Sequence, residues 1–200
     1  MNKALKALTL SVALLASPAA FAAAAPDTLA RNTTNEVIQI VKQDDDIKNG
    51  RSSKVYALVE TKILPHFDFQ RMAKLAVARN WNIATPEQQQ TLVDEFRSLL
   101  VRTYAASISS VSDYKVDFKP LRMASGDTDV IINSEVSKPG APPITIDYRM
   151  EKMGEDWKVY DVVVDGVSLV TVYRNSFSSE VRRGGIDGLI QALTRRNQRK

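Results

Sequence analysis

Between Asp113 and Val164 the sequence alternates apolar and polar side chains with a period of two, the pattern of half-buried β-strands. Turn-forming residues divide this stretch into four segments, at 114–118, 130–136, 144–150 and 157–164. Four such segments joined by short connections predict an antiparallel sheet in meander order with one apolar face. That face has to be covered by other elements of the chain, because an exposed apolar sheet face is not stable in water.

Helical periodicity lies on both sides of the strands. Helices are expected from Pro26 to the acidic run at 44–46, from Gly50 to Pro65, from Asp68 to about Arg79, and from Thr85 to about Ser109. After the strands, Asp165-Gly166 is a turn signal, and Val170, Tyr173 and Phe177 then share one helix face. Gly184-Gly185 separates that helix from a short final one.

The best-defined helix start is Thr85-Pro86-Glu87-Gln88. Thr85 is placed as the N-cap, Pro86 occupies the first helical position, and Gln88 can close a capping box. The helix that follows would be roughly 36 Å long at 1.5 Å per residue. Because this length can cover one face of a small sheet, we expect its apolar stripe, which includes Phe96 and Leu99, to face the strands. The predicted fold class is therefore α+β, a four-stranded antiparallel sheet with several helices packed on one face.

Residues 1–22 have the pattern of a secretory signal peptide. Lys3 and Lys6 precede a short apolar segment, and Ala20-Phe21-Ala22 is a cleavage site of the A-x-A type. The chain contains no cysteine, which excludes disulfides, thiol catalysis and an acylated cysteine anchor. No later stretch reaches 18 apolar residues. We therefore expect a single mature domain at 23–200 that is soluble in a bacterial periplasm after the signal peptide is cleaved.

Side chains for catalysis or metal binding are scarce. His66 is the only histidine, and no G-x-S-x-G or glycine-rich phosphate motif accompanies it, so a structural role is favoured and no cofactor or metal is expected. The segment 171–200 carries seven basic side chains against Glu180 and Asp187. A basic end suits anionic lipid headgroups or an acidic partner, or is only a solvated helix end. Nucleic acid is not expected as a partner of an exported protein.

Wide apolar faces are what the sequence has in excess. The predicted sheet and the predicted helices each present one. A dry core, in which these faces close on each other, is the default interpretation of the pattern. The alternative is a cleft between the sheet and the helices that holds an apolar ligand.

Several motifs, taken together, resemble the MlaC family, which is also called the toluene-tolerance auxiliary transport family. The motifs span the mature chain in order: Pro65-His66-Phe67-Asp68-Phe69-x-x-Met72, Trp81-x-x-Ala84-Thr85-Pro86-Glu87-Gln88-Gln89, Phe96-Arg97-x-Leu99-Leu100-x-Arg102-Thr103-Tyr104, and Asp165-Gly166-Val167-Ser168-Leu169-Val170-x-x-Tyr173-Arg174. The chain departs from the family pattern at Ala78, where glycine is frequent, and at Val172, where asparagine is frequent.

The resemblance implies a non-enzymatic periplasmic phospholipid carrier with an NTF2-like fold and an apolar lipid cavity. Its implied partners are a phospholipid, an inner-membrane ABC transporter complex and an outer-membrane lipoprotein–porin complex, in a pathway that maintains outer-membrane lipid asymmetry. The side chains then expected to contact lipid are Ile63, Phe67, Phe69, Met72, Leu92, Phe96, Leu99, Tyr104, Ile132, Ile144, Ile146, Tyr148, Val167 and Val170. A periplasmic hydrolase of a lipid or small apolar substrate, and a carrier of another apolar ligand, are the alternatives.

Overall fold

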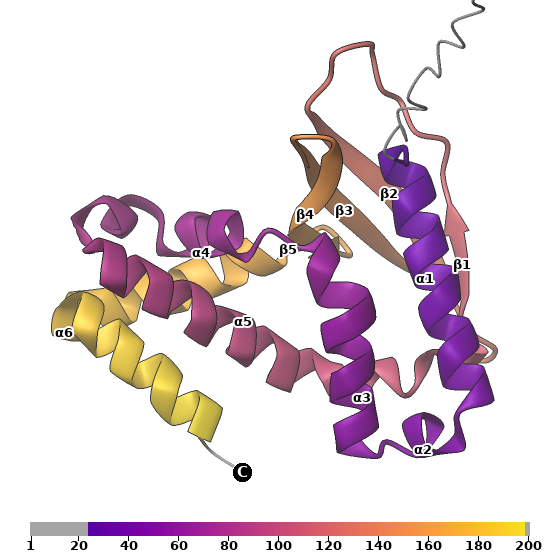
Figure 1. The fold of residues 1–200 in the computed structure, drawn as a ribbon, viewed down its shortest axis with the longest axis horizontal. Helices are drawn as coiled ribbons and strands as arrows, with labels where there is room; N and C mark the ends of the chain where they lie inside the picture. Colours follow the sequence, from indigo (N-terminus) through magenta and orange to yellow (C-terminus); the bar gives the residue numbers. More distant parts are fainter. Residues whose placement is uncertain (1–23, 199–200) are drawn as a thin grey trace, which may run out of the picture.

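The computed structural model describes residues 24–198, and the predicted signal peptide at 1–22 lies outside the described residues. The described chain contains one antiparallel sheet with the strand order β1-β2-β3-β4-β5 (Figure 1). Its strands are β1 Lys115–Phe118, β2 Asp129–Ser137, β3 Ile144–Met153, β4 Asp156–Val164 and β5 Val167–Ser168. The predicted α+β class and the meander order are confirmed. The sheet has one strand more than predicted, because two residues after the Asp165-Gly166 turn pair back onto β4.

The helical elements precede and follow the sheet. They are α1 Pro26–Gln43, α2 Asp45–Lys48, α3 Ser52–Leu58, the π-helix η1 Val59–Ile63, the 3₁₀ turn η2 Leu64–His66, α4 Phe69–Val77, η3 Ala78–Ile83, α5 Pro86–Ile108, η4 Val111–Asp113 and α6 Leu169–Gln198.

Local capping chemistry sets the helix starts. At α5 the backbone N–H of Gln88 donates to Thr85 Oγ1 at 3.2 Å, and the N–H of Thr85 donates to Gln88 Oε1 at 2.9 Å, so the predicted capping box is confirmed. At α4 the carboxylate of Asp68 accepts the N–H of Arg71 at 2.9 Å, which confirms the predicted N-cap. These bonds satisfy N–H groups that have no partner within the helix.

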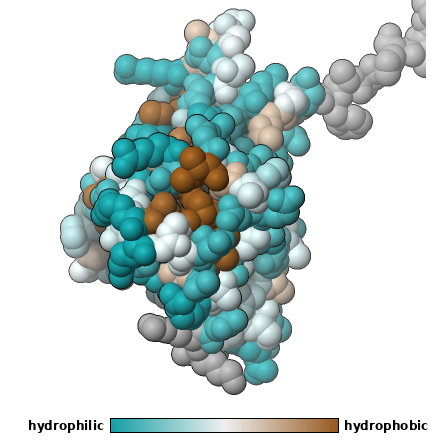
Figure 2. All heavy atoms as spheres, turned by 90° about the vertical axis from the view of Figure 1, so that its left-hand side faces the viewer, coloured by the Kyte–Doolittle hydropathy of each residue, from teal (hydrophilic) through white to brown (hydrophobic). Residues whose placement is uncertain are grey.

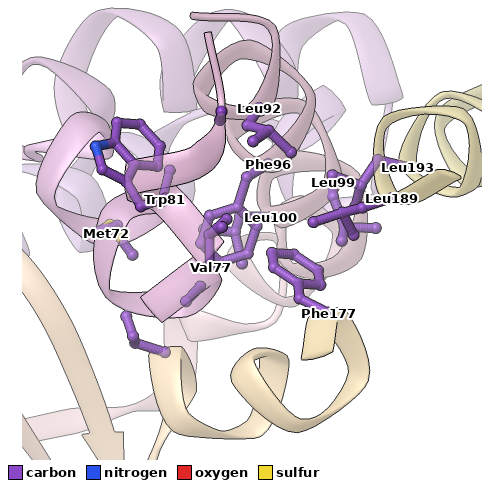
Figure 3. Packing of buried hydrophobic residues seen from close by; sticks show 14 of the residues in the cluster. Met72, Val77, Trp81, Leu92, Phe96, Leu99, Leu100, Phe177, Leu189 and Leu193 are labelled. Carbon is purple, nitrogen blue, oxygen red and sulfur yellow. The ribbon is translucent and has the colours of Figure 1, made fainter. Parts of the chain in front are cut away.

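The helices form two groups around separate apolar clusters (Figure 1). In one group, α1 and α3 lie beside the sheet. In the other, α4, α5 and α6 pack on one another at the side of the sheet, around a cluster in which Phe96, Leu99 and Phe177 meet (Figure 3). The expectation that Phe96 and Leu99 face the strands is therefore wrong. The apolar stripe of α5 was correctly identified, but α6 covers it instead of the sheet.

Two glycines turn α6 back along α5. Gly184 and Gly185 have non-helical backbone angles inside α6, and Gly185 has φ of 68°, a left-handed conformation that glycine adopts without strain. The predicted break is thus confirmed. After it, Thr194 Oγ1 donates to Glu95 Oε1 at 2.7 Å and Asn197 Nδ2 donates to Glu95 Oε2 at 2.6 Å. The final turns of α6 are therefore fastened to α5.

A β-bulge allows β4 to place buried side chains against both helix groups. Arg149 lies opposite Asp161 and Met150 opposite Val159, so that Tyr160 is the extra residue. Val159 packs on the sheet face that α1 covers, whereas Tyr160 is buried in the cluster of α4, α5 and α6. The guanidinium of Arg71 on α4 lies 3.5 Å from the centre of the Tyr160 ring. The same group forms ion pairs with Asp129 and Glu151 at 2.9 Å and 2.6 Å, which tie α4 to the sheet.

A buried carboxylate holds the start of α6 against β4. Asp161 is 2% exposed, accepts the N–H of Val170 at 3.1 Å, and accepts the hydroxyl of Ser168 at 2.6 Å. The Ser168 oxygen accepts the N–H of Thr171 at 3.1 Å. A negative charge is favourable at a helix N-terminus, so this arrangement fixes the direction in which α6 leaves the sheet.

The outer surface of the α4–α6 group has an apolar patch ringed by hydrophilic atoms (Figure 2). Between residues 24 and 198 no helix is both long and apolar enough to cross a membrane.

Candidate functional site

A cavity of about 360 Å³ lies between α1 and the sheet face that α1 covers. The elements η1 and η2, the end of α5 and η4 also contribute lining residues. Its lining residues are Leu29, Ala30, Thr33, Thr34, Val37, Ile38, Ile63, His66, Phe67, Ser107, Ile108, Val111, Tyr114, Val116, Val136, Ile144, Ile146, Tyr148, Met150 and Val159. Its volume falls in the range of roughly 300–1,000 Å³ that is typical of small-molecule sites.

Helix α1 forms one wall through two adjacent rows of side chains. One row contains Leu29, Thr33 and Val37, and the other contains Ala30, Thr34 and Ile38. Residues four apart lie on the same side of a helix, so these two rows form a single strip along α1. Thr33 and Thr34 are short and leave space between the helix and the strands, which is where the cavity is found.

The opposite wall consists of alternate residues of the strands. Ile144, Ile146 and Tyr148 project from β3, and Val116 and Val136 project from β1 and β2. The pleat of a strand places every second side chain on the same face. The alternation that predicted the strands therefore also supplies the apolar wall.

The polar groups of the cavity are few and uncharged. They come from Thr33, Thr34, His66, Ser107, Tyr114 and Tyr148, and no Asp, Glu, Lys or Arg lines the space. Burial raises the pKa of Tyr148. Burial, and then the charge of Lys158, lower the pKa of His66, so that both side chains favour their neutral forms. Such a cavity can bury a hydrocarbon chain, but it offers no ion pair to a charged group.

The cavity brings together five of the side chains predicted to contact lipid: Ile63, Phe67, Ile144, Ile146 and Tyr148. The other nine lie outside its lining. Met72, Leu92, Phe96, Leu99 and Val170 are buried in the cluster of α4, α5 and α6, and Phe69 packs against that cluster. Ile132 is buried with Phe118 and Trp157 on the sheet face that α1 covers. Tyr104 and Val167 are exposed.

The contribution of α1 is the main feature absent from the predicted contact set. Leu29, Thr33 and Val37 were recognisable as one face of a helix from their spacing. The pattern does not show which helix lies over the sheet, and the longer helix α5 was expected there. The signal available in the sequence for a cavity beside α1 was the pair of threonines within its apolar stripe. These side chains are shorter than leucine and carry a hydroxyl.

The fold and the cavity together define a small α+β protein of the ligand-binding class, whose sheet and first helix enclose an apolar cavity. The chain belongs to the MlaC family, since the family model described as MlaC protein matches residues 31–195. The resemblance identified from the motifs is thereby confirmed.

Relatives of known name agree with this assignment. The chain is 23% identical over 167 residues to toluene tolerance protein ttg2D of Pseudomonas putida, which covers 83% of this chain and 77% of that protein. It is 20% identical over 184 residues to the intermembrane phospholipid transport system binding protein MlaC of Haemophilus influenzae, covering 90% of this chain and 86% of the relative.

A solved structure supports the fold over nearly the whole chain. The phospholipid-binding protein from Ralstonia solanacearum, determined in complex with a phospholipid, is 42% identical. It superposes with a TM-score of 0.81, covering 87% of this chain and 97% of the other.

Proposed function

We propose that this protein is a periplasmic phospholipid carrier that holds acyl chains in the cavity between α1 and the sheet. The observation that carries the proposal is an apolar cavity in a chain 42% identical to a protein solved with a phospholipid. The phosphate and headgroup would remain outside, because no charged side chain lines the cavity. Leu29, Val37, Ile144 and Ile146 are the side chains we propose to contact the chains.

Affinity in such a site would come from the chains and not from the headgroup. Each methylene removed from water contributes roughly 0.8 kcal/mol. Ten buried methylenes would therefore supply about 8 kcal/mol, before the cost of immobilising the lipid. Little selection among headgroups is expected, because the headgroup would lie outside the cavity and no charged side chain lines the cavity to bind it.

The proposed route of the carrier runs between two membrane complexes. We infer that the chain is exported by the signal peptide at 1–22, folds as one domain at 23–200, and moves phospholipid between an outer-membrane lipoprotein–porin complex and an inner-membrane ABC transporter complex. Support comes from membership of the MlaC family and from the signal-like residues at the start of the chain.

The test is the mass of the protein with its ligand. Protein purified gently from a bacterial periplasm should show native mass spectra with about one phospholipid per chain, and solvent extraction should release several headgroup classes. A purely apo mass would contradict the proposal. If the extract contained an isoprenoid or another apolar compound instead, the cavity would still be a binding site, but its ligand would not be a phospholipid.

A further inference from the structure

Three carboxyl groups converge on one guanidinium where α4 meets the sheet. The guanidinium of Arg71 lies 2.6 Å from Glu151 Oε2 on β3 and 2.9 Å from Asp129 Oδ2 on β2. Asp68, at the N-cap of α4, has its carboxyl group within hydrogen-bonding reach of the Glu151 side chain. If all three acids were ionised, Arg71 would leave two negative charges uncompensated around Glu151, whose side chain is only 22% exposed.

The groups opposite Glu151 in the sheet do not supply the missing positive charge. Asp129 on β2 and Lys158 on β4 are its direct cross-strand neighbours. Asp129 adds a like charge to the site. Lys158 Nζ donates to the carbonyl oxygen of Pro65 at 2.9 Å and lies 3.8 Å from Asp156 Oδ2, so its charge is engaged elsewhere.

Two further titratable groups face the site from β3 and β4. The hydroxyl of Tyr160 donates to Asp129 Oδ1 at 2.7 Å. Burial, and then this hydrogen bond, raise the pKa of Tyr160 to about 12, so its hydroxyl stays neutral. Arg149 lies 3.6 Å from Asp161 Oδ2. Within residues 24–198, Arg71 is therefore the one ion-pair partner of the Glu151 carboxyl group.

One oxygen of Glu151 has no hydrogen-bond donor. Oε2 is paired with Arg71, whereas Oε1 is buried and has no partner among the described residues. Buried carboxylate oxygens are normally hydrogen-bonded. Two carboxyl groups can hydrogen-bond to each other only when one of them carries a proton, and a proton held between Asp68 and Glu151 supplies the missing donor. In agreement, burial and then the contact with Asp68 raise the pKa of Glu151 against the opposing charge of Arg71.

This carboxyl pair lies directly behind the wall of the cavity. Phe67 and Met150 both line the cavity, and Asp68 and Glu151 are the residues that follow them in the chain. The N–H of Asp68 donates to the carbonyl oxygen of Val159 at 2.9 Å, and Phe67 forms a parallel bridge with the same residue. A link between Asp68 and Glu151 therefore joins two chain segments that carry this part of the wall.

We propose that Asp68 and Glu151 share one proton in the folded protein, and that this proton clasp fastens the Phe67 wall of the cavity to β3. The proton clasp is a property of the folded chain, whichever apolar ligand the cavity holds. Because folding raises the pKa of Glu151, the stabilisation is complete below the ordinary value of 4.5 and is lost as the pH rises through the folded-state pKa. Loss of the proton leaves two carboxylates in contact, which repel each other.

Carbon-13 NMR of the carboxyl groups, recorded from about pH 8 to about pH 3, measures the proton directly. In wild type, Glu151 should titrate above 4.5. In Asp68→Asn it should titrate at lower pH than in wild type, because the amide donates to Glu151 and carries no charge, while asparagine still caps α4. Glu155→Gln, at a side chain that is 87% exposed, is the control and should leave the titration of Glu151 unchanged. A wild-type Glu151 that titrates at or below 4.5, or one that Asp68→Asn does not shift, would overturn the shared proton.

Glu151→Gln tests the clasp, because its amide gives Asp68 a permanent donor. The unfolding constant of wild type relative to this variant, measured in urea, should rise from about pH 4 to about pH 8. The expected rise is up to tenfold for each pH unit between 4.5 and the folded-state pKa of Glu151. His66 titrates in both proteins, so the ratio isolates Glu151.

Release of a bound dye tests the effect of the clasp on the cavity. Delipidated protein is loaded with an uncharged, apolar naphthylamine dye, and the rate of dye release from wild type relative to Glu151→Gln should rise over the same pH range. Ratios of unfolding constants or of release rates that do not change with pH would overturn the clasp. The wild-type titration decides the shared proton even if Glu151→Gln does not fold.

Discussion

Enlarging one side chain in the cavity and one in the helical cluster should separate binding from stability. Ile146 lines the cavity, whereas Leu99 is 8% exposed among α4, α5 and α6. In Ile146→Trp the larger ring would occupy space that the proposed ligand needs. If it displaces four methylenes at roughly 0.8 kcal/mol each, the loss is about 3 kcal/mol, or more than a hundredfold in affinity.

Leu99→Trp should have the opposite outcome. Overpacking a dry core typically costs about 1–3 kcal/mol. For a chain of this length each kcal/mol lowers the melting temperature by roughly 2–4 °C, so a fall of about 2–12 °C is expected with lipid occupancy unchanged. Native mass spectrometry reports the occupancy, and circular dichroism reports the melting temperature of delipidated protein. The reasoning is refuted if Leu99→Trp empties the protein without destabilising it, or if Ile146→Trp destabilises it and leaves it loaded.

Three further predictions concern the groups that fix the fold. Asp161→Ala should lower the free energy of unfolding by about 0.5–2 kcal/mol, because Val170 and Ser168 at the start of α6 lose their acceptor. Urea unfolding measures this loss, and Asp156→Ala, at an exposed site, is the control. Thr85→Ala should cost about 1 kcal/mol through loss of the capping box, and an unchanged urea midpoint would contradict this. The pKa of His66 is lowered by burial and by Lys158, so its contribution to stability is present above pH 6.5 and is lost as the pH falls through the folded-state pKa. Melting temperatures measured from pH 8 to pH 5 should therefore fall less in His66→Gln than in wild type, and parallel curves would refute that assignment.

Predictions from the sequence were accurate where the local pattern determines the structure. The alternation at Ile144, Ile146 and Tyr148 predicted both a strand and its apolar face, and these side chains line the cavity. Thr85 and Asp68 were recognised as caps because capping depends on residues three positions apart. In each case the deciding contacts lie within a few residues along the chain.

Predictions failed where the structure depends on which elements meet. The stripe on α5 that contains Phe96 and Leu99 is buried as expected, but periodicity does not identify the covering partner, and α6 takes that place. Ile132 lies on the same sheet face as Ile146, yet Phe118 and Trp157 fill the space around it. Burial next to the cavity and burial within it have the same sequence pattern, so only the three-dimensional arrangement separates them.

The separation of the two apolar regions explains how a hollow protein can remain folded. The cluster of α4, α5 and α6 is closed by its own side chains, including Phe96, Phe177 and Leu189, and it includes none of the residues that line the cavity except Phe67 at its edge. An empty apolar cavity lowers stability because its walls lack contacts. That cost falls on α1 and the sheet, while the helical cluster keeps its full packing. A ligand that entered the cavity would add stability by mass action, and its departure would leave the helical cluster intact to hold α6 and β4 in place.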